Sequence, residues 1–236
     1  MDARLNKKIF ITGTGTDIGK TYVSGLIAKK LHEKGYDTAY FKAAMSGNDR
    51  REDGSLIPGD ALHVKTVSGL EQPLEEMCPY VYETAVSPHL ASRLEGNHVK
   101  LNVVKKAFNE VSTQHDYVIV EGSGGILCPL CFDEEKLWLE DVVKALDLSC
   151  IIIADAGLGT INSVVLTVFY MRAKNIKVNG IIFNRFHKGD VMKEDNLKMC
   201  EYMTGVKVVA CVQDGDTDIN IDAARLAALF DEGECR

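Results

Sequence analysis

The feature that most constrains the fold is a glycine-rich loop within residues 7–21, between a short apolar run and a helical pattern. The run Ile9-Phe10-Ile11 is typical of a buried strand. Glycines 13, 15 and 19 let successive backbone N–H groups line one concave surface. Such a surface at a helix N-terminus, followed by Lys20 and Thr21, is a polyphosphate site. The stretch predicts a nucleotide-binding loop, and a turn that binds nothing is disfavoured because Gly-Lys-Thr stands between strand and helix.

The spacing of the loop narrows the class of nucleotide-binding protein. The common pattern, Gly-x4-Gly-Lys-[Ser/Thr], would need a glycine where this chain has Thr14. The first glycine is Gly13, so the loop is one residue longer. Partition and nitrogenase-iron-protein ATPases carry a signature lysine where this chain has Gly15. The loop therefore belongs to neither of these patterns.

A second apolar run, 116–121, ends in Glu121 and is followed by a glycine-rich segment. A buried strand that ends in an acid next to a phosphate loop is the usual source of a magnesium ligand. Glu121, Asp60 and the Thr21 hydroxyl are oxygen donors suited to Mg²⁺. The alternatives are that Glu121 is a solvated rim charge and that Asp60 caps a helix.

Strand and helix patterns alternate along the whole chain, which predicts a three-layer α/β/α fold with a mainly parallel central sheet and one domain, 1–236. The structural class is that of P-loop nucleotide-binding proteins. Further strands are expected at 38–41, 149–155, 178–184 and 207–212, the last of these being the final strand. Helices are expected near 61–64, at 101–113, after 157 and around 223–229. Segment 71–98 is expected to be irregular, and within it residues 86–92 are expected to form a loop that leads into a helix.

Two further side chains follow predicted strands at the same edge of the sheet. Asn184 can present its amide to a purine edge, which suits adenine. A guanine reader would need an acid where this chain has His187, so ATP is favoured. Lys42 is expected to face the γ-phosphate, although a lysine here can also be a plain surface residue. Two lysines and a metal ion suit phosphoryl transfer.

Composition excludes several classes of partner. The chain of 236 residues carries a formal net charge of −7, which argues against nucleic acid and anionic membranes as partners. Its seven cysteines lie mostly in apolar patterns and predict reduced core thiols in a cytoplasmic protein. The one Cys-x-x-Cys, Cys128 to Cys131, has no second half for zinc, so packing or chance is the favoured interpretation.

Five motifs in order resemble those of the dethiobiotin synthetase family. The family's loop, Gly-Thr-x-Thr-[Asp/Glu]-x-Gly-Lys-Thr, matches Gly13 to Thr21 throughout. Its Lys-Pro-x-x-[Ser/Thr]-Gly segment resembles Lys42 to Gly47, and its Ser-Pro-His resembles Ser87 to His89. Its Glu-Gly-[Ala/Ser]-Gly-Gly segment resembles Glu121 to Gly125, and its Gly-x-Ile-Asn resembles Gly159 to Asn162. The likeness covers nearly the whole chain.

The resemblance implies an ATP- and Mg²⁺-dependent ligase of biotin biosynthesis. The substrates would be 7,8-diaminopelargonic acid and CO₂ or bicarbonate. One amine captures CO₂ as a carbamate, the γ-phosphoryl of ATP activates it as a carbamic–phosphoric anhydride, and the other amine closes the ureido ring. The family also implies a homodimer in which the helix that starts near Gly159 meets the partner's substrate carboxylate.

The resemblance carries over site residues position by position. The catalytic set is Lys42, Lys20 and Thr16. The substrate set is Ser46, Pro88, Gly159 and Asn162, and the magnesium set is Thr21, Asp60 and Glu121. The nucleotide set is Gly15, Thr16, Asp17, Ile18, Gly19, Lys20, Thr21, Tyr22, Asp60, Glu121, Gly122, Ser123, Gly124, Asn184, Arg185 and Gln213.

Two positions depart from the family pattern, and two rival functions remain. Ala43 replaces a usual proline, and Gln213 stands near a usual proline of the loop that touches the adenine. One rival is a nucleotide-driven switch ATPase of the partition type, against which Gly15 and the acidic balance argue. The other is a synthetase domain of the cobyrinate type, which would need a glutaminase partner.

Overall fold

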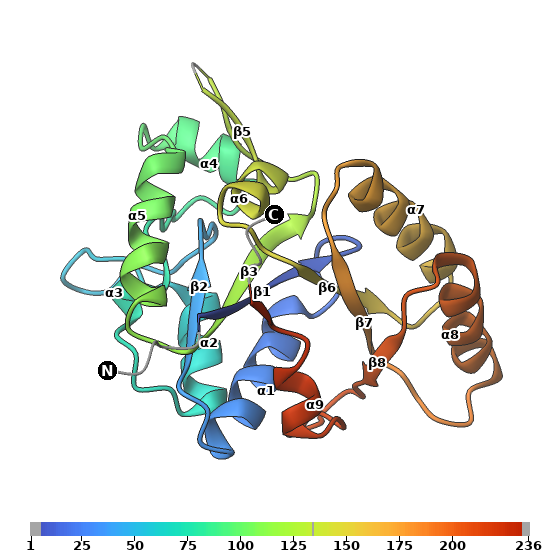
Figure 1. The fold of residues 1–236 in the computed structure, drawn as a ribbon. Helices are drawn as coiled ribbons and strands as arrows, with labels where there is room; N and C mark the ends of the chain where they lie inside the picture. Colours follow the sequence, from blue (N-terminus) through green and yellow to red (C-terminus); the bar gives the residue numbers. More distant parts are fainter. Residues whose placement is uncertain (1–5, 134, 233–236) are drawn as a thin grey trace.

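A computed structural model describes residues 6–133 and 135–232. A twisted sheet forms its centre and helices cover both faces (Figure 1). The strands are β1 Lys7–Gly13, β2 Thr38–Lys42, β3 Tyr117–Gly125, β4 Pro129–Phe132, β5 Lys136–Trp138, β6 Cys150–Asp155, β7 Val178–Asn184, β8 Val208–Cys211 and β9 Asp231–Glu232. The helices are α1 Lys20–Glu33, α2 Gly59–Ser68, α3 Leu74–Met77, α4 Pro88–Leu94, α5 Leu101–Ser112, α6 Leu139–Ala145, α7 Thr160–Ala173, α8 Val191–Thr204 and α9 Ala223–Ala227.

The main sheet has the order β2-β3-β1-β6-β7-β8, and every neighbouring pair in that order is parallel. Because the strands run the same way, their carboxyl ends gather at one edge, where α/β proteins bind ligands. The parallel register sets Lys42 at the end of β2 directly beside Glu121 of β3. The predicted mainly parallel α/β fold is therefore confirmed.

Alternation along β1 shows why the sheet needs helices on both faces. Phe10 packs into one core with side chains of α5, α6, α7 and α8, whereas Ile9 and Ile11 pack into a second core with α1, α2 and α9. All three side chains are fully buried. A central parallel strand buried on both faces reads as a continuous apolar run, which is what the sequence has.

Local signals fix several helix ends. Pro88 occupies the first turn of α4, where its missing N–H costs nothing. Asp190 accepts backbone N–H groups of Met192 and Lys193 and so caps α8. Gly35 follows the C-cap residue of α1, Lys34, and has a φ of 80°, a conformation that favours glycine after a helix.

Some expectations needed correction. The strand near 207–212 is not the last, because β9 follows it and pairs antiparallel with β1. The terminal helix α9 ends at Ala227, so Leu229 lies beyond it. Segment 71–98 contains the short α3 besides the expected α4, and the β4–β5 hairpin, α6 and α8 were not anticipated. In the described part of the chain, no helix has both the length and the apolar content needed to cross a bilayer.

The close packing behind the site gives a first prediction. A Cβ at Gly122 would lie 2.7 Å from both Leu139 Cδ2 and Phe10 Cζ, inside van der Waals contact. Gly122→Ala should therefore lower the free energy of unfolding by about 1–3 kcal/mol, as overpacked cores do. Urea unfolding of the ligand-free protein measures this change.

The matched control is Gly15→Ala, because a Cβ there meets no atom of the described structure within 4 Å. Its free energy of unfolding should stay within about 0.5 kcal/mol of that of the wild type. Equal midpoints for the two variants would contradict the packing argument.

Candidate active site

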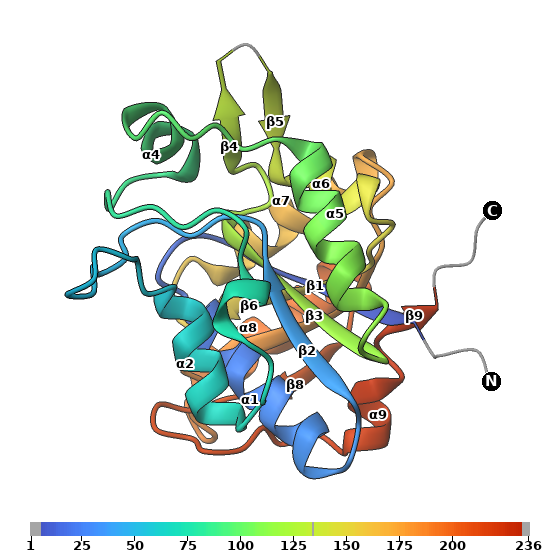
Figure 2. The same ribbon diagram turned by 90° about the vertical axis from the view of Figure 1, so that its left-hand side faces the viewer.

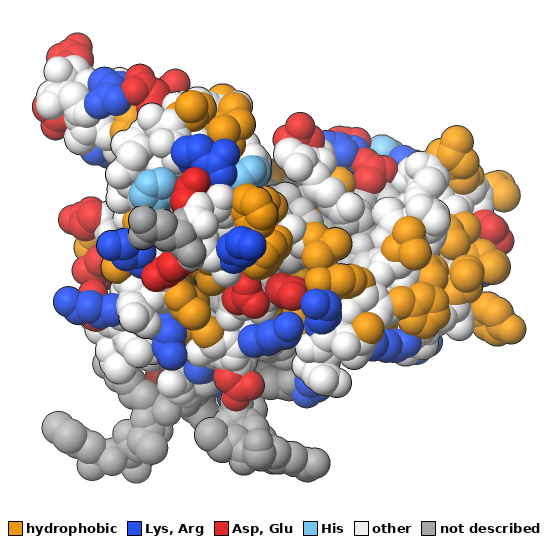
Figure 3. Space-filling model, turned by 90° about the horizontal axis from the view of Figure 1, so that it is seen from above, with side chains coloured by type: hydrophobic (Ala, Val, Ile, Leu, Met, Phe, Trp, Pro, Cys, Tyr) orange, Lys and Arg blue, Asp and Glu red, His pale blue; other side chains and the backbone are white. Residues whose placement is uncertain are grey.

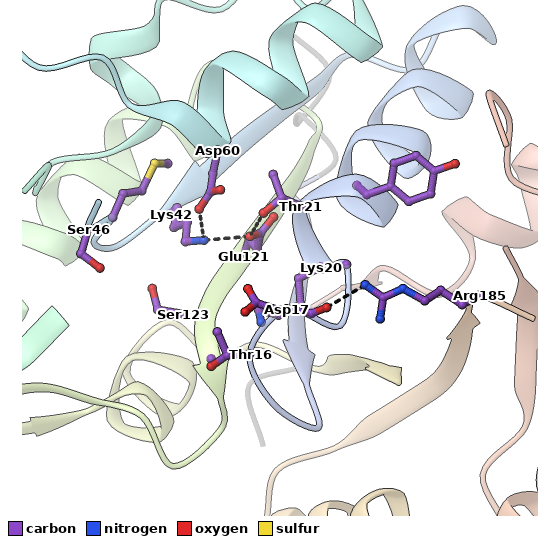
Figure 4. A pocket seen from close by; sticks show the side chains of 14 residues that line it. Thr16, Asp17, Lys20, Thr21, Lys42, Ser46, Asp60, Glu121, Ser123 and Arg185 are labelled. Carbon is purple, nitrogen blue, oxygen red and sulfur yellow. Dashed lines mark hydrogen bonds and ion pairs between the residues drawn. The ribbon is translucent and has the colours of Figure 1, made fainter. Parts of the chain in front are cut away.

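A cavity of about 530 Å³ opens at the carboxyl ends of β1, β2 and β3. Figure 4 shows side chains of the phosphate loop and α1, the end of β2, α2 and β3 converging on it, with Arg185 after β7 at its side. It is lined by Thr16, Asp17, Gly19, Lys20, Thr21, Tyr22, Lys42, Met45, Ser46, Asp60, Glu121, Ser123, Gly124 and Arg185. The structure therefore brings the phosphate loop, both predicted lysines and all three predicted magnesium ligands to one place.

The centre of the cavity is an ion group formed by Lys42. Its Nζ lies 2.5 Å from Asp60 Oδ2 and 2.8 Å from Glu121 Oε1, as the dashed lines of Figure 4 show. The Lys42 side chain is only 6% exposed, so the alternative of a surface lysine is wrong. Burial opposes its charge, but the two carboxylates outweigh burial and raise the pKa of Lys42. Lys42 is therefore a firmly protonated ammonium group.

The acids around Lys42 fit a divalent cation. Glu121 is fully buried, so it is not a solvated rim charge, and its Oε1 also accepts a 2.8 Å hydrogen bond from the Thr21 hydroxyl. Its Oε2 is buried and has no hydrogen-bond partner among the described residues. A buried carboxylate oxygen without a partner is costly, and a bound cation would satisfy it. Asp60 lies in the first turn of α2, whose N-cap is Pro58, so Asp60 is not the helix cap.

The phosphate loop holds Lys20 at the N-terminus of α1. Lys20 Nζ donates a 3.0 Å hydrogen bond to the Gly15 carbonyl, inside the loop. Burial, and then the neighbouring charge of Lys42, lower the pKa of Lys20. A second cation in a confined site favours an anion there, which is consistent with a phosphate-binding role.

Asn184, at the end of β7, holds the phosphate loop in place through a hydrogen bond to its backbone. Its Nδ2 donates to the Ile18 carbonyl at 2.9 Å, and the side chain is almost fully buried. Gly19 has a φ of 88°, and a Cβ there would lie 2.1 Å from that amide nitrogen, so the close approach requires glycine. A base contact through Asn184 Nδ2 would require this hydrogen bond to break, and the predicted contact with a purine stays a prediction.

Arg185 and Tyr22 line the side of the cavity next to β7 and the segment that follows β8. Arg185 bonds Asp155 at 2.6 Å and donates to the Asp17 carbonyl at 2.9 Å. The Tyr22 hydroxyl donates to the carbonyls of Gln213, at 3.4 Å, and of Asp216. These contacts tie the start of α1 to both segments, and Gln213 itself does not line the cavity.

The predicted substrate residues divide into two groups. The Ser46 hydroxyl faces the cavity side and donates to the Val86 carbonyl at 2.6 Å, two residues before Pro88. Gly159 and Asn162 lie at the start of α7, away from the residues that line the cavity. Their substrate role was predicted only for a partner subunit.

Sequence reasoning missed one lining residue, Met45. It follows Lys42 in an extended segment and forms an isolated bridge with Val81. Its side chain is 98% buried, so only a small part of it borders the cavity. The only sequence signal was its place between Lys42 and Ser46, two residues already chosen. Of the predicted nucleotide residues, Gly15, Ile18 and Gly122 support the cavity but do not line it.

Comparison with known proteins assigns the family. A family model described as an AAA domain matches residues 7–217. An ATP-dependent dethiobiotin synthetase (BioD) of Brachyspira hyodysenteriae is 51% identical over 226 residues, which cover 95% of this chain and 99% of the relative. The chain belongs to the dethiobiotin synthetase family. A second family member, from Clostridium perfringens, is 45% identical over 208 residues, 88% of this chain and 91% of its own.

Solved structures agree with the fold of this family member. A chain of the MinC:MinD cell division protein complex of Aquifex aeolicus superposes with a TM-score of 0.55 at 14% identity, over 88% of this chain and 81% of that chain. A ParA family ATPase of Chlorobium tepidum superposes with a TM-score of 0.51 at 15% identity, over 89% of this chain and 85% of the ATPase chain. At such identities the likeness shows a shared P-loop fold and nothing about activity.

The ion group predicts a pH-dependent contribution to stability. Burial raises the pKa of Asp60, but the charge and hydrogen bond of Lys42, together with the contributions of Thr21 and Lys20, outweigh burial and hold the pKa below its usual value. A carboxyl with a lowered pKa stabilises the fold above its unfolded pKa of about 3.9 and loses that contribution as the pH falls through the folded pKa. Asp60→Asn should therefore cost about 1 kcal/mol at pH 7, since Asp60 is 40% exposed and screened, and much less near pH 3.

Urea unfolding at pH 7, 5 and 3 tests this expectation. Asp195→Asn, at an exposed position of α8, serves as the control and should change little at any of these pH values. A cost for Asp60→Asn that is equal at pH 7 and pH 3 would show that the pairing with Lys42 does not stabilise the fold.

Proposed function

We propose that this protein closes the ureido ring of dethiobiotin from 7,8-diaminopelargonic acid and CO₂, with ATP as the phosphoryl donor. The observation that supports this most strongly is the meeting of Lys20, Lys42 and Glu121 in one cavity at the carboxyl edge of the sheet. The names of the family members support the same reaction. The cysteines of the described residues are free thiols, which is consistent with a cytoplasmic enzyme.

Each lysine has a separate part in the proposed reaction. Lys20, at the N-terminus of α1, holds the β- and γ-phosphates together with the loop N–H groups and Thr16. Lys42 faces the cavity from the end of β2, which β3 separates from β1 and its phosphate loop. Its ammonium group can therefore neutralise both the carbamate and the transferring phosphoryl group. The phosphoryl group moves to the carbamate oxygen, and attack by the second amine then expels phosphate. Catalysis rests on positioning and charge rather than on a protein nucleophile.

Thr21, Asp60 and Glu121 are the residues that would hold Mg²⁺. Oε2 of Glu121 supports this assignment, because this buried oxygen accepts no hydrogen bond from any described residue, whereas Oε1 is paired with Lys42. Magnesium bound there would neutralise charge on the phosphate oxygens. Oxygen donors alone suit Mg²⁺ better than zinc or copper.

We further propose that the enzyme is a homodimer. In Figure 3, hydrophobic side chains gather at the right-hand end of the molecule, over α7 and α8. On α7, Leu166 is 60% exposed and Phe169 51% exposed, while Tyr202 of α8 is 83% exposed. Contiguous apolar surface of this kind is typical of subunit contacts. A contact through α7 would bring Gly159 and Asn162 to the partner's substrate, as the family resemblance implies.

The test of the function is product formation. The protein should convert 7,8-diaminopelargonic acid, bicarbonate and Mg-ATP to dethiobiotin, followed by mass spectrometry, with one ADP for each product molecule. Lys20→Ala should lower kcat about 10²–10³-fold, which is the scale of one lost oxyanion contact. ATP hydrolysis that ignores the diamine would favour a switch ATPase instead, and near-normal turnover of Lys20→Ala would refute the role of Lys20.

The metal assignment has its own test. Glu121→Gln removes the charge but keeps the shape, so it should raise the Mg²⁺ concentration for half-maximal turnover by about tenfold or more. Asp155→Asn is the matched control, because Asp155 also ends a strand at this edge but faces Arg185. Its magnesium requirement should stay at the wild-type value. An unchanged titration for Glu121→Gln would move the metal ligand elsewhere.

A further inference from the structure

A cluster of three different metal-ligating side chains lies outside the proposed active site. The side chains are His98, Cys131 and Asp133, and their ligand atoms all lie within 4.8 Å of one another. His98 comes from the connection between α4 and α5, whereas Cys131 and Asp133 come from β4 and the turn after it. Figure 2 shows that connection passing beside the β4–β5 hairpin. None of the three lines the active-site cavity.

The contact between His98 and Asp133 points to a shared ligand. His98 Nδ1 lies 3.1 Å from Asp133 Oδ2. Even so, that oxygen is shielded from solvent and accepts no hydrogen bond from any described residue. A buried carboxylate oxygen in such a state is costly unless a cation satisfies it. The two atoms form an ion pair when His98 is protonated, and when His98 is neutral their lone pairs can converge on one metal ion.

The surroundings hold the three groups in place. Arg93 of α4 bonds the other oxygen of Asp133, at 2.7 Å, and the adjacent Phe132 carbonyl, at 2.8 Å. This contact turns Oδ2 toward His98. The preceding Asn97 carbonyl accepts a 2.6 Å hydrogen bond from the Tyr82 hydroxyl, which fixes the connection that carries His98. Outer contacts that orient ligands in this way are typical of metal sites.

We propose that His98, Cys131 and Asp133 form a Zn²⁺ site, with water as the fourth ligand. Zinc takes imidazole nitrogen, thiolate and carboxylate ligands in tetrahedral geometry, with bonds of about 2.0–2.3 Å. Such bonds place ligand atoms about 3.3–3.6 Å apart. The pair of His98 and Asp133 is near that spacing, and the Cys131 thiol must move closer by at most about 1.3 Å, within the reach of a side-chain rotation.

Charge and fold indicate what the metal would do. One thiolate and one carboxylate neutralise Zn²⁺, and Arg93 remains outside as a counter-charge for the Asp133 oxygen that faces away. Binding would join the α4–α5 connection to the β4–β5 hairpin, which forms a two-stranded sheet separate from the main sheet. The site is therefore a structural clamp on the wall beside α4, whose first residue is the predicted substrate residue Pro88.

The Cys-x-x-Cys spacing gains a different meaning from this geometry. Cys128 and Cys131 do not act as a pair, because Cys128 lies beside Gly124. Burial raises the pKa of the Cys128 thiol, and the nearby charges of Lys20 and Lys42 oppose that rise. Cys131 instead turns to His98 and Asp133. The second half that zinc needs comes from another element of the fold and not from a second Cys-x-x-Cys.

The experiment uses the full-length, untagged, metal-free protein titrated with Zn²⁺ against a chromophoric chelator. One equivalent should bind, with release of about one proton because thiols bind zinc as thiolates. Co²⁺ should give a thiolate-to-metal absorption band. Cys131→Ser and His98→Gln should each weaken zinc binding by more than about 100-fold, and the former should abolish the cobalt band.

Two control variants separate this site from chance binding. Cys128→Ser keeps the proposed ligands, and His115→Gln removes a histidine that pairs with Asp37 at 2.7 Å without a thiol nearby. Both should bind zinc as the wild type does. His98→Gln changes a 42% exposed side chain, so the fold should be retained, and an unchanged circular dichroism spectrum checks this. Absence of stoichiometric binding, or equal losses in Cys131→Ser and Cys128→Ser, would overturn the proposal.

Discussion

The pairing of Lys42 with Glu121 is the constraint on which the site depends. The two residues are register partners at the ends of β2 and β3, so one parallel ladder fixes their distance. A buried glutamate without a counter-charge would be strongly destabilising. Lys42 supplies that charge and also draws Asp60 from the first turn of α2. The position of α2 above the sheet and the charge of the cavity are thus set by one ammonium group.

The sequence predicted the parts of the fold in which local and global signals agree. The run from Ile9 to Ile11, the long loop and Glu121 each carry a pattern that only a buried strand or a phosphate loop explains. Because parallel strands end at one edge, strand assignment alone was enough to bring Lys20, Lys42 and Glu121 together. The family resemblance then added residues, such as Ser46 and Arg185, that no periodicity could have chosen, and both line the cavity.

The features that the sequence did not reveal depend on tertiary contacts. β9 is a two-residue strand that pairs with Lys7 and Lys8 of β1, on the side where β6 pairs with β1 only from Phe10 onward. β4 begins at Pro129 and β5 has three residues, so neither has a readable alternation. The hydrogen bond from Asn184 to the Ile18 carbonyl joins residues 166 positions apart, and a single sequence has no signal for such a contact.

The two lysines of the cavity differ in what their charge is matched to. Lys42 has two carboxylates against it, and its pKa is raised, so its charge is already compensated in the protein alone. Lys20 donates to a carbonyl, and burial and the charge of Lys42 lower its pKa in spite of the opposing charges of Glu121 and Asp60, so its charge is less well compensated than that of Lys42. An incoming phosphate therefore gains most from Lys20, at the helix N-terminus. A Mg²⁺ ion bound by Glu121 and Asp60 would compete with Lys42 for the same two carboxylates. The Lys42 ammonium group would then be available to a second anion. The charges of Lys20, Lys42, Asp60 and Glu121 thus cancel in the ligand-free cavity, and a bound cation would leave each lysine free to attract a different anion.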